Sequence, residues 1–233
     1  MVTAMQAYVS LWSADLLALG AAVDLLDGTV DGFHVDVFDG HNVPDLLFGP
    51  DFVAALRRRT VATIDVHLNT TDPDYWVDRF ADAGADIITV QTAPCHDLRA
   101  TLAHIRDRGV RAGLGLETHE PLRHAVDHLD AVDRVLLLGT AIGVKGQDID
   151  PAAPGRVAGL VAARHGDTPI VVDGGIRKHT VPALAQAGAD GVVPGSLVFG
   201  EPDPRRAADE IRALRPGHRD RLSAFWTDSV VQR

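Results

Sequence analysis

The sequence predicts a (β/α)8 barrel. Short apolar, β-branched segments alternate with longer segments of helical periodicity along the chain, an order typical of a parallel sheet covered by helices. Eight such pairs occur in 233 residues, close to the roughly 250 residues typical of this barrel. The alternative is an open, doubly wound sheet, but eight units in one chain favour closure. We expect residues 1–233 to form one domain, with a C-terminal tail from about residue 216.

The predicted strands are apolar nearly throughout, as expected of strands buried on both faces. They cover 8–12, 33–38, 63–68, 86–91, 110–116, 134–139, 169–173 and 191–194. The predicted helices cover 13–26, 50–59, 74–83, 97–108, 121–129, 154–164, 180–187 and 204–214. The first helix opens with the cap-like Ser-Ala-Asp at 13–15 and repeats leucine at helical spacing. Ala-Gly-Ala-Asp occurs at 83–86 and again at 187–190, where a glycine ends the helix before the next strand.

Composition excludes several kinds of partner. Lys plus Arg is 22 and Asp plus Glu is 32, a net charge of −10, which argues against nucleic acid and anionic membranes. No segment approaches the roughly 18 apolar residues of a membrane span, and residues 1–6 lack the features of a signal peptide. We therefore expect a cytoplasmic protein. The one cysteine, Cys95, excludes an intrachain disulfide and is expected to be a spectator thiol.

Candidate metal ligands lie at the ends of three predicted strands. His34 and Asp36 alternate along the second strand and so face the same side, His67 ends the third, and Asp173 ends the seventh. The carboxyl ends of the strands are where active sites form in this fold. Asp65 lies deeper in the barrel and is expected to play a structural role or to support the ligands.

Two imidazoles and two carboxylates suit zinc or another divalent first-row metal. Each residue alone could equally be a hydrogen-bonded structural residue. Burial of four polar groups on inward-facing positions is costly unless they are paired, and one metal ion would satisfy all of them. We therefore predict a divalent metal, with Zn²⁺ preferred and Fe²⁺, Mn²⁺ and Co²⁺ as alternatives.

A phosphate site is predicted from glycines after the last two strands. Gly174 and Gly175 follow the seventh strand, and Gly195 and Ser196 follow the eighth. Glycines let backbone N–H groups approach an anion, and these two loops commonly bind phosphate in this fold. An ordinary turn is the alternative for the Gly-Gly pair alone. The substrate is thus expected to be a small phosphorylated molecule.

The loop 139–147, after the sixth strand, is long and glycine-spaced. It can close over a substrate and bring Lys145 and the Gly146 amide near the phosphate. The alternative is a mobile surface loop with a solvated lysine.

Taken together, these residues resemble the ribulose-phosphate 3-epimerase family, nearly collinearly from about Ser10 to Gly200. The matching segments are Ser-Leu-Trp-Ser-Ala-Asp at 10–15, His-Val-Asp-Val-Phe-Asp-Gly-His at 34–41, Phe-Gly-Pro at 48–50, Asp-Val-His-Leu at 65–68, Ala-Gly-Ala-Asp at 83–86, Val-Asp-Gly-Gly-Ile at 172–176 and Gly-Ser at 195–196.

The resemblance implies an isomerase that inverts C3 of a ketose phosphate such as ribulose 5-phosphate or xylulose 5-phosphate. Asp36 and Asp173 would be both metal ligands and the two acid–base groups, on opposite faces of the substrate carbon, with an enediolate between the two proton transfers. Ser10 would touch the substrate near the metal. The residues implied to hold the phosphate are Gly146, Gly175, Gly195 and Ser196.

The sequence departs from the family at positions that contact the sugar. The family's usual methionines correspond to Phe38, Asn69 and Leu138. In the loop after the sixth strand, Asn-Pro-Gly-Phe-Gly-Gly-Gln becomes Ala-Ile-Gly-Val-Lys-Gly-Gln at 141–147. A common His and Glu after the fourth strand become Gln91 and Ala93, and Asn-Pro after the fifth becomes Glu117-Thr118.

Two other functions stay open at the level of sequence. A related barrel lyase or aldose–ketose isomerase for another sugar phosphate is suggested by Asn69, Glu117 and Lys145, which would reshape the pocket. A non-catalytic sugar-phosphate sensor is the third hypothesis, and the complete acid–base pair argues against it. Phe225 and Trp226 in the tail can pack on the barrel or on a second subunit, and we expect a homo-oligomer.

Overall fold

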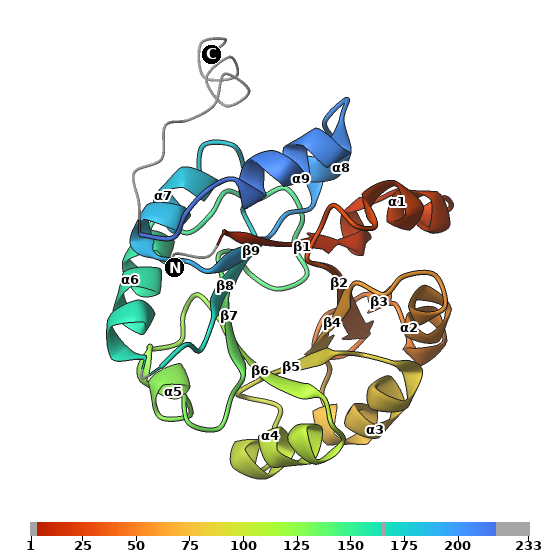
Figure 1. The fold of residues 1–233 in the computed structure, drawn as a ribbon. Coiled ribbons are helices and arrows are strands. Elements are labelled where there is room, and N and C mark those ends of the chain that lie inside the picture. The colour runs from red at the N-terminus through yellow and green to blue at the C-terminus, as the bar shows by residue number, and fades with distance from the viewer. Residues whose placement is uncertain (1–3, 165, 218–233) are drawn as a thin grey trace.

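Eight parallel strands form the centre of the molecule in a computed structural model that describes residues 4–164 and 166–217. They are β1 (Gln6–Ser10), β2 (Gly32–Asp39), β4 (Thr63–Asn69), β5 (Ile87–Gln91), β6 (Arg111–Leu116), β7 (Arg134–Leu138), β8 (Ile170–Asp173) and β9 (Gly191–Val193). Each pairs with the next, and β1 pairs with both β2 and β9, which closes the sheet (Figure 1). The predicted (β/α)8 barrel is confirmed.

Helices surround the barrel in a ring (Figure 1). They are α1 (Leu19–Leu26), α2 (Pro50–Arg57), α3 (Pro73–Ala83), α4 (Leu98–Asp107), α5 (Arg123–Val126), α6 (Ala153–Ala163), α7 (Val181–Ala187), α8 (Ser196–Phe199) and α9 (Pro204–Arg212). The repeated Ala-Gly-Ala-Asp motif ends α3 and α7 as predicted. Gly84 and Gly188 adopt φ of 99° and 98° there, a left-handed conformation that favours glycine.

Several elements differ from the sequence prediction, including β1, which begins and ends two residues before the predicted strand, and the short helix α8, which was not predicted. The helix predicted from residue 13 begins only at Leu19, because η1 (Leu11–Ser13) is a 3₁₀ turn and the Asp15 carboxylate accepts the Leu17 N–H in a turn of its own. The helix predicted over 121–129 is helical only in α5. A short strand, β3 (Leu46–Leu47), pairs antiparallel with the end of β2 and was not predicted.

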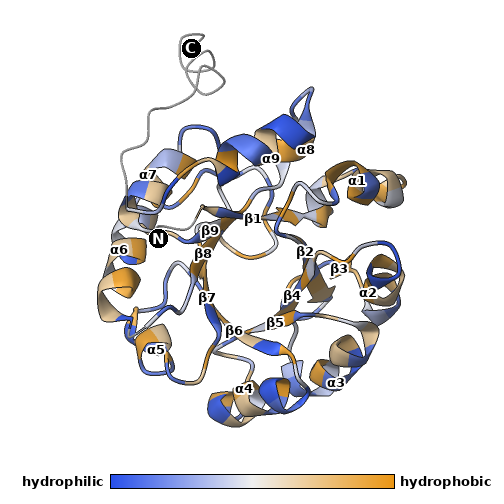
Figure 2. Cartoon of the chain, in the orientation of Figure 1, coloured by the Kyte–Doolittle hydropathy of each residue, from blue (hydrophilic) through white to orange (hydrophobic). Residues whose placement is uncertain are grey.

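The two faces of the strands differ: the outer face packs against the helices, and the inner face lines the barrel. Outward-facing residues such as Val35 and Val66 pack with the helices in the main hydrophobic core, and Figure 2 shows hydrophobic residues concentrated in the strands and mixed with hydrophilic ones on the helices. Inside the barrel, a smaller apolar cluster that includes Tyr8 and Leu136 lies beside buried polar side chains. These polar side chains include Ser10, His34, Asp36, Asp65, His67, Asn69, Thr89, Gln91 and Arg134. The functional groups therefore project into the barrel.

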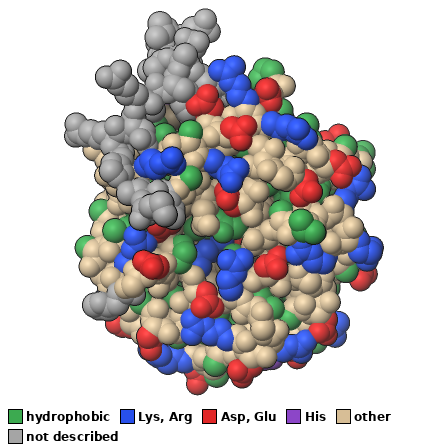
Figure 3. Space-filling view, in the orientation of Figure 1, with side chains coloured by type: hydrophobic (Ala, Val, Ile, Leu, Met, Phe, Trp, Pro, Cys, Tyr) green, Lys and Arg blue, Asp and Glu red, His purple; other side chains and the backbone are tan. Residues whose placement is uncertain are grey.

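None of the helices in residues 4–164 and 166–217 has the length and apolarity needed to cross a bilayer. On the face drawn in Figure 3, acidic and basic side chains are interspersed rather than gathered by sign. The tail predicted from about residue 216, with Phe225 and Trp226, lies almost wholly outside the described residues.

Candidate active site

Four side chains meet at one end of the barrel interior: His34 and Asp36 from β2, His67 from β4 and Asp173 from β8. The pairing of β2 with β4 sets Asp36 beside His67 and His34 beside Asp65. One donor atom from each of the four residues lies within 4.8 Å of the other three. The sequence predicted this set, and the fold brings all four together.

The distances between these donor atoms suit a metal ion. His34 Nε2 lies 3.3 Å from Asp36 Oδ1 and 3.7 Å from Asp173 Oδ2, and His67 Nδ1 lies 3.4 and 3.9 Å from the same oxygens. Tetrahedral ligands at zinc distances are about 3.3–3.6 Å apart. His67 Nδ1 is buried and has no hydrogen-bond partner within the described part of the chain. The residues present therefore fit a divalent metal.

A chain of buried charges holds His34 in place. Asp65 Oδ2 lies 2.6 Å from His34 Nδ1, and Arg134 Nη2 donates to both Asp65 oxygens at 2.6 Å. The Arg134 guanidinium also lies 5.1 Å from the Tyr8 ring centroid. Asp65 fixes the ring proton on Nδ1 and directs Nε2 toward the cluster, the usual role of a carboxylate behind a metal-binding histidine.

Burial and neighbouring charges set the protonation of the cluster in the absence of a metal. Burial raises the pKa of Asp173 to about 6, although His34 lowers it. Burial also raises the pKa of Asp36, but the charge of His34, its hydrogen bond to Asp36 and the charge of His67 outweigh burial and hold that pKa well below its usual range. Burial lowers the pKa of His34, yet the carboxylates of Asp36 and Asp65 raise it well above normal.

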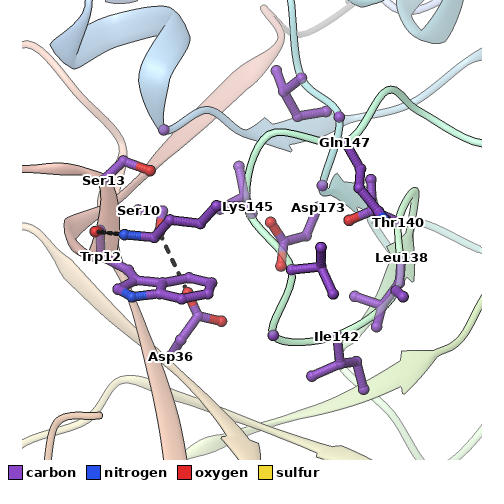
Figure 4. Close-up of a pocket in the computed structure, with 18 of the residues that line it drawn as sticks. Ser10, Trp12, Ser13, Asp36, Leu138, Thr140, Ile142, Lys145, Gln147 and Asp173 are labelled. Atoms are coloured by element: carbon purple, nitrogen blue, oxygen red, sulfur yellow. Dashed lines mark hydrogen bonds between the residues drawn. The ribbon is translucent and has the colours of Figure 1, made fainter. Parts of the chain in front are cut away.

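A pocket opens above the cluster and is lined by Asp36, His67 and Asp173 but not by the fully buried His34. Figure 4 shows Asp36 and Asp173 on facing sides of it. Ser10 Oγ donates to Asp36 Oδ2 at 3.3 Å (Figure 4). One Asp36 oxygen thus faces the histidines, and the other faces Ser10 and the pocket.

Lys145 crosses the mouth of this pocket from the loop after β7 (Figure 4). Its Nζ donates to the Trp12 carbonyl oxygen at 2.6 Å and lies 4.2 Å from the centroid of the Trp12 ring. Burial lowers the Lys145 pKa. Lys145 therefore joins the loop after β7 to the turn after β1 across the pocket.

The predicted phosphate residues Gly146, Gly174, Gly175, Gly195 and Ser196 all line the same pocket. Gly174 and Gly175 adopt φ of 90° and 68°, which L side chains rarely do. A Cβ on Gly195 would lie 2.2 Å from Ser13 Oγ. Only glycine lets the backbone approach this closely.

Comparison with known proteins agrees with the site. Residues 6–199 match the ribulose-phosphate 3 epimerase family. The chain belongs to this family. It is 39% identical over 212 residues to the ribulose-phosphate 3-epimerase of Bacillus subtilis (strain 168), an alignment that covers 88% of this chain and 97% of that protein. The enzyme of the same name from Escherichia coli (strain K12) is 34% identical over 209 residues, covering 88% and 93%.

Members of this family are isomerases, and the chain is an epimerase that acts on carbohydrates. Solved structures show the same fold at lower identity. KGPDC from Streptococcus mutans matches with a TM-score of 0.70 at 18% identity, over 92% of this chain and 99% of that one. Orotidine 5′-phosphate decarboxylase from Pyrococcus horikoshii OT3 matches with a TM-score of 0.67 at 16% identity, over 89% and 97%.

Positions at which the sequence was predicted to depart from the family pattern line the pocket on β2, β4 and β7 and in the loop after β7. They include Phe38, Asn69, Leu138 and Ile142. Phe38 packs edge-on against Trp12 with ring centroids 5.1 Å apart. Glu117 was predicted to reshape the pocket, but it is not among the described lining residues, and its side chain lies 3.7 Å from His119 instead.

Sequence reasoning predicted a supporting role for Asp65, which contacts His34, but it missed Arg134 and Gln91. Arg134, on β7, reaches across the barrel to Asp65, and Gln91 Nε2, on β5, lies 2.6 Å from His67 Nε2. Thr140 and Arg177 also line the pocket without having been predicted. A charged residue within an otherwise apolar strand, as in Arg134-Val135-Leu136, was the available signal, because such a charge must find a buried partner.

Proposed function

We propose that this protein is a metal-dependent ketose-phosphate 3-epimerase, with ribulose 5-phosphate and xylulose 5-phosphate as the first substrates to test. The observation that carries the proposal is the close approach of the four donor atoms. Two of them belong to carboxylates that face one pocket. Membership of a family whose relatives are named ribulose-phosphate 3-epimerase supports it.

Asp36 and Asp173 are the proposed acid–base pair. Epimerisation requires one group to remove the C3 proton and another to deliver a proton from the opposite face. The two carboxylates come from β2 and β8, and they face each other across the pocket (Figure 4). Since the reaction is reversible, each serves as the base in one direction. Ser10, which donates to Asp36 Oδ2, holds the free oxygen of that carboxylate toward the substrate.

His34, Asp36, His67 and Asp173 would hold the divalent metal, with Zn²⁺ preferred. When bound, the metal would polarise the substrate carbonyl as a Lewis acid and stabilise the enediolate. The four donors supply two nitrogen and two oxygen atoms, a set also compatible with Fe²⁺, Mn²⁺ and Co²⁺.

The phosphate is proposed to bind the backbone amides of Gly175, Gly195 and Ser196, with Gly146 and Gly174 beside them. The positive φ of Gly174 and Gly175 and the close approach of Gly195 to Ser13 support this end of the pocket as the anion site. Lys145, at the pocket mouth, adds a positive charge to this site in the proposal.

The test is solvent deuterium exchange at C3. Ribulose 5-phosphate, xylulose 5-phosphate and a panel of ketohexose phosphates are incubated in D₂O with Zn²⁺ or Mn²⁺, and products are identified by NMR. We expect deuterium at C3 together with inversion for at least one substrate. Exchange without inversion, a new aldose or a cleaved product would favour the isomerase or lyase alternative. A panel without any turnover would reject the proposal.

A further inference from the structure

Gln91 occupies a confined position beside the metal cluster. It ends β5, is 1% exposed, and points into the barrel with its Nε2 2.6 Å from His67 Nε2. Gly115 lies opposite it on β6, where a Cβ would come within 2.4 Å of Gln91 Nε2. The absence of a side chain at residue 115 therefore provides the space that the Gln91 carboxamide fills.

A contact between two nitrogen atoms at this distance requires one to donate and the other to accept. With the carboxamide NH₂ toward the ring, His67 Nε2 accepts, and the ring proton must lie on Nδ1. In this arrangement Gln91 Oε1 has no hydrogen-bond partner among the described residues, and neither has His67 Nδ1. Two buried polar atoms are left unsatisfied, which is costly.

A half-turn of the carboxamide puts its NH₂ group in the place where Oε1 has no partner, and it leaves Nδ1 with a lone pair that a metal ion would satisfy. Gln91 Oε1 then accepts the His67 Nε2–H, and the Nδ1 lone pair is free. Nδ1 is the ring atom that faces Asp36 and Asp173, at 3.4 and 3.9 Å. It is therefore the atom that a metal in this cluster would take from His67.

His34 is held in the same way, but the two ring nitrogens have exchanged roles. Its Nδ1 lies 2.6 Å from an Asp65 oxygen, which leaves Nε2 to face the cluster. An acceptor on the far side of each ring is what fixes the tautomer of a metal-binding histidine. Asp65 fills this position for His34, and among the described residues only Gln91 is hydrogen-bonded to the far nitrogen of His67.

We propose that Gln91 is a positioning residue for the metal site: its carboxamide oxygen accepts the His67 Nε2 proton and so keeps Nδ1 available as a ligand. The inference rests on the proposed metal site. It assigns a role to a residue at which this chain departs from the pattern of its family. Unlike a carboxylate, an amide can turn either edge to the ring, so it can pair with both tautomers of His67.

The experiment measures metal affinity directly. Zn²⁺ and Mn²⁺ are titrated against a chromophoric chelator into the parent, Gln91→Leu, Gln91→Glu and Gln147→Leu, without sugar phosphate. We expect Gln91→Leu to bind about 10–100-fold more weakly and Gln91→Glu, which always accepts, to bind at least as tightly as the parent. Gln147→Leu is the matched control, because Gln147 lines the pocket and no described hydrogen bond joins it to a ligand.

Circular dichroism melts establish that each variant is folded. Equal affinity of Gln91→Leu and the parent would overturn the inference, as would a Gln91→Glu affinity as low as that of Gln91→Leu. If the parent itself binds no metal, it is the proposed function that fails.

A second readout needs no variant. Histidine ¹⁵N–¹H NMR of the Zn²⁺-loaded parent should show a protonated Nε2 and an unprotonated Nδ1 at His67. The opposite assignment would overturn the inference even if Gln91→Leu did not fold.

Discussion

Asp173 is the carboxylate that the local environment perturbs most clearly toward the neutral form, with a pKa of about 6. Replacement of Asp173 by Asn keeps its shape but removes its ability to accept a proton and weakens it as a metal ligand. We expect Asp173→Asn to lose at least about 10²–10⁴-fold in turnover while the far-ultraviolet circular dichroism stays that of the parent. Deuterium exchange at C3 measures the loss, and turnover close to that of the parent would refute the acid–base role.

Lys145 gives a second prediction at the scale of one residue. If its ammonium contacts the substrate phosphate, Lys145→Ala removes a charge-assisted hydrogen bond and should raise the KM about tenfold or more. The matched control is Lys178→Ala, because Lys178 pairs with Glu201 and lies outside the described pocket lining. Steady-state kinetics of both variants decides the question. An unchanged KM in Lys145→Ala would restrict Lys145 to its contacts with Trp12.

Some of these residues could be found in the sequence and others could not. His34, Asp36 and His67 were found because side chains alternate along a strand and active sites form at its carboxyl end. The contacts of Gln91 with His67 and of Arg134 with Asp65 depend on which positions of different strands lie at one depth in the barrel. That relation is set by the register between strands, which a single sequence does not state.

At the scale of elements, the end of β2 is tied to the end of β4 by Asp39. Its carboxylate accepts N–H groups from His41, Asn42 and Thr71 at 2.9, 3.0 and 2.7 Å. Burial raises the pKa of Asp39, but these hydrogen bonds outweigh it and lower the pKa to about 2. The loop that follows β2 is therefore anchored by a charged acceptor.

Asp39→Asn should lower the free energy of unfolding by about 1 kcal/mol at pH 7, allowing for solvent near the carboxylate. A folded-state pKa below the unfolded value contributes stability above about pH 4, and this contribution is lost as the pH falls toward 2. The difference between parent and variant should therefore shrink over that interval. Urea unfolding at pH 7, 4 and 3 measures it. A difference independent of pH would show that the charge of Asp39 is not involved.

Elements were predictable where one pattern dominates locally. The helix ends at Gly84 and Gly188 follow from glycine's freedom to adopt positive φ. The start of α1 was misplaced because the leucines at 16 and 17 continue the helical pattern, whereas the Asp15 turn holds the backbone in another conformation. The two-residue strand β3 is too short to produce an alternating pattern.

At the scale of the whole molecule, the four ligands come from the neighbouring strands β2 and β4 and from β8, which β1 and β9 separate from β2. A metal bound to all four would link these strands in the folded state only. At a metal concentration 100 times the Kd, the folded state gains about 2.7 kcal/mol, or roughly 5–11 °C in Tm for a chain of this size.

We therefore expect a chelator to lower the Tm by that amount and to abolish turnover, and Zn²⁺ or Mn²⁺ to restore both. Calorimetry with and without chelator, followed by the exchange assay after metal is returned, measures the two effects. Unchanged Tm and turnover after exhaustive chelation would contradict the metal site.

The buried pair of Asp65 and Arg134 beneath His34 has a consequence for how this barrel can change. A desolvated ion pair can often be exchanged for apolar residues of similar volume with no loss of stability, or with a gain. Selection for heat resistance alone would therefore favour apolar residues at these two positions inside the barrel. His34 would then lose the carboxylate that holds its ring. The buried charges therefore set a trade-off between thermal stability and catalysis. Thermostable variants selected without an activity screen should accumulate substitutions at residues 65 and 134 and become inactive.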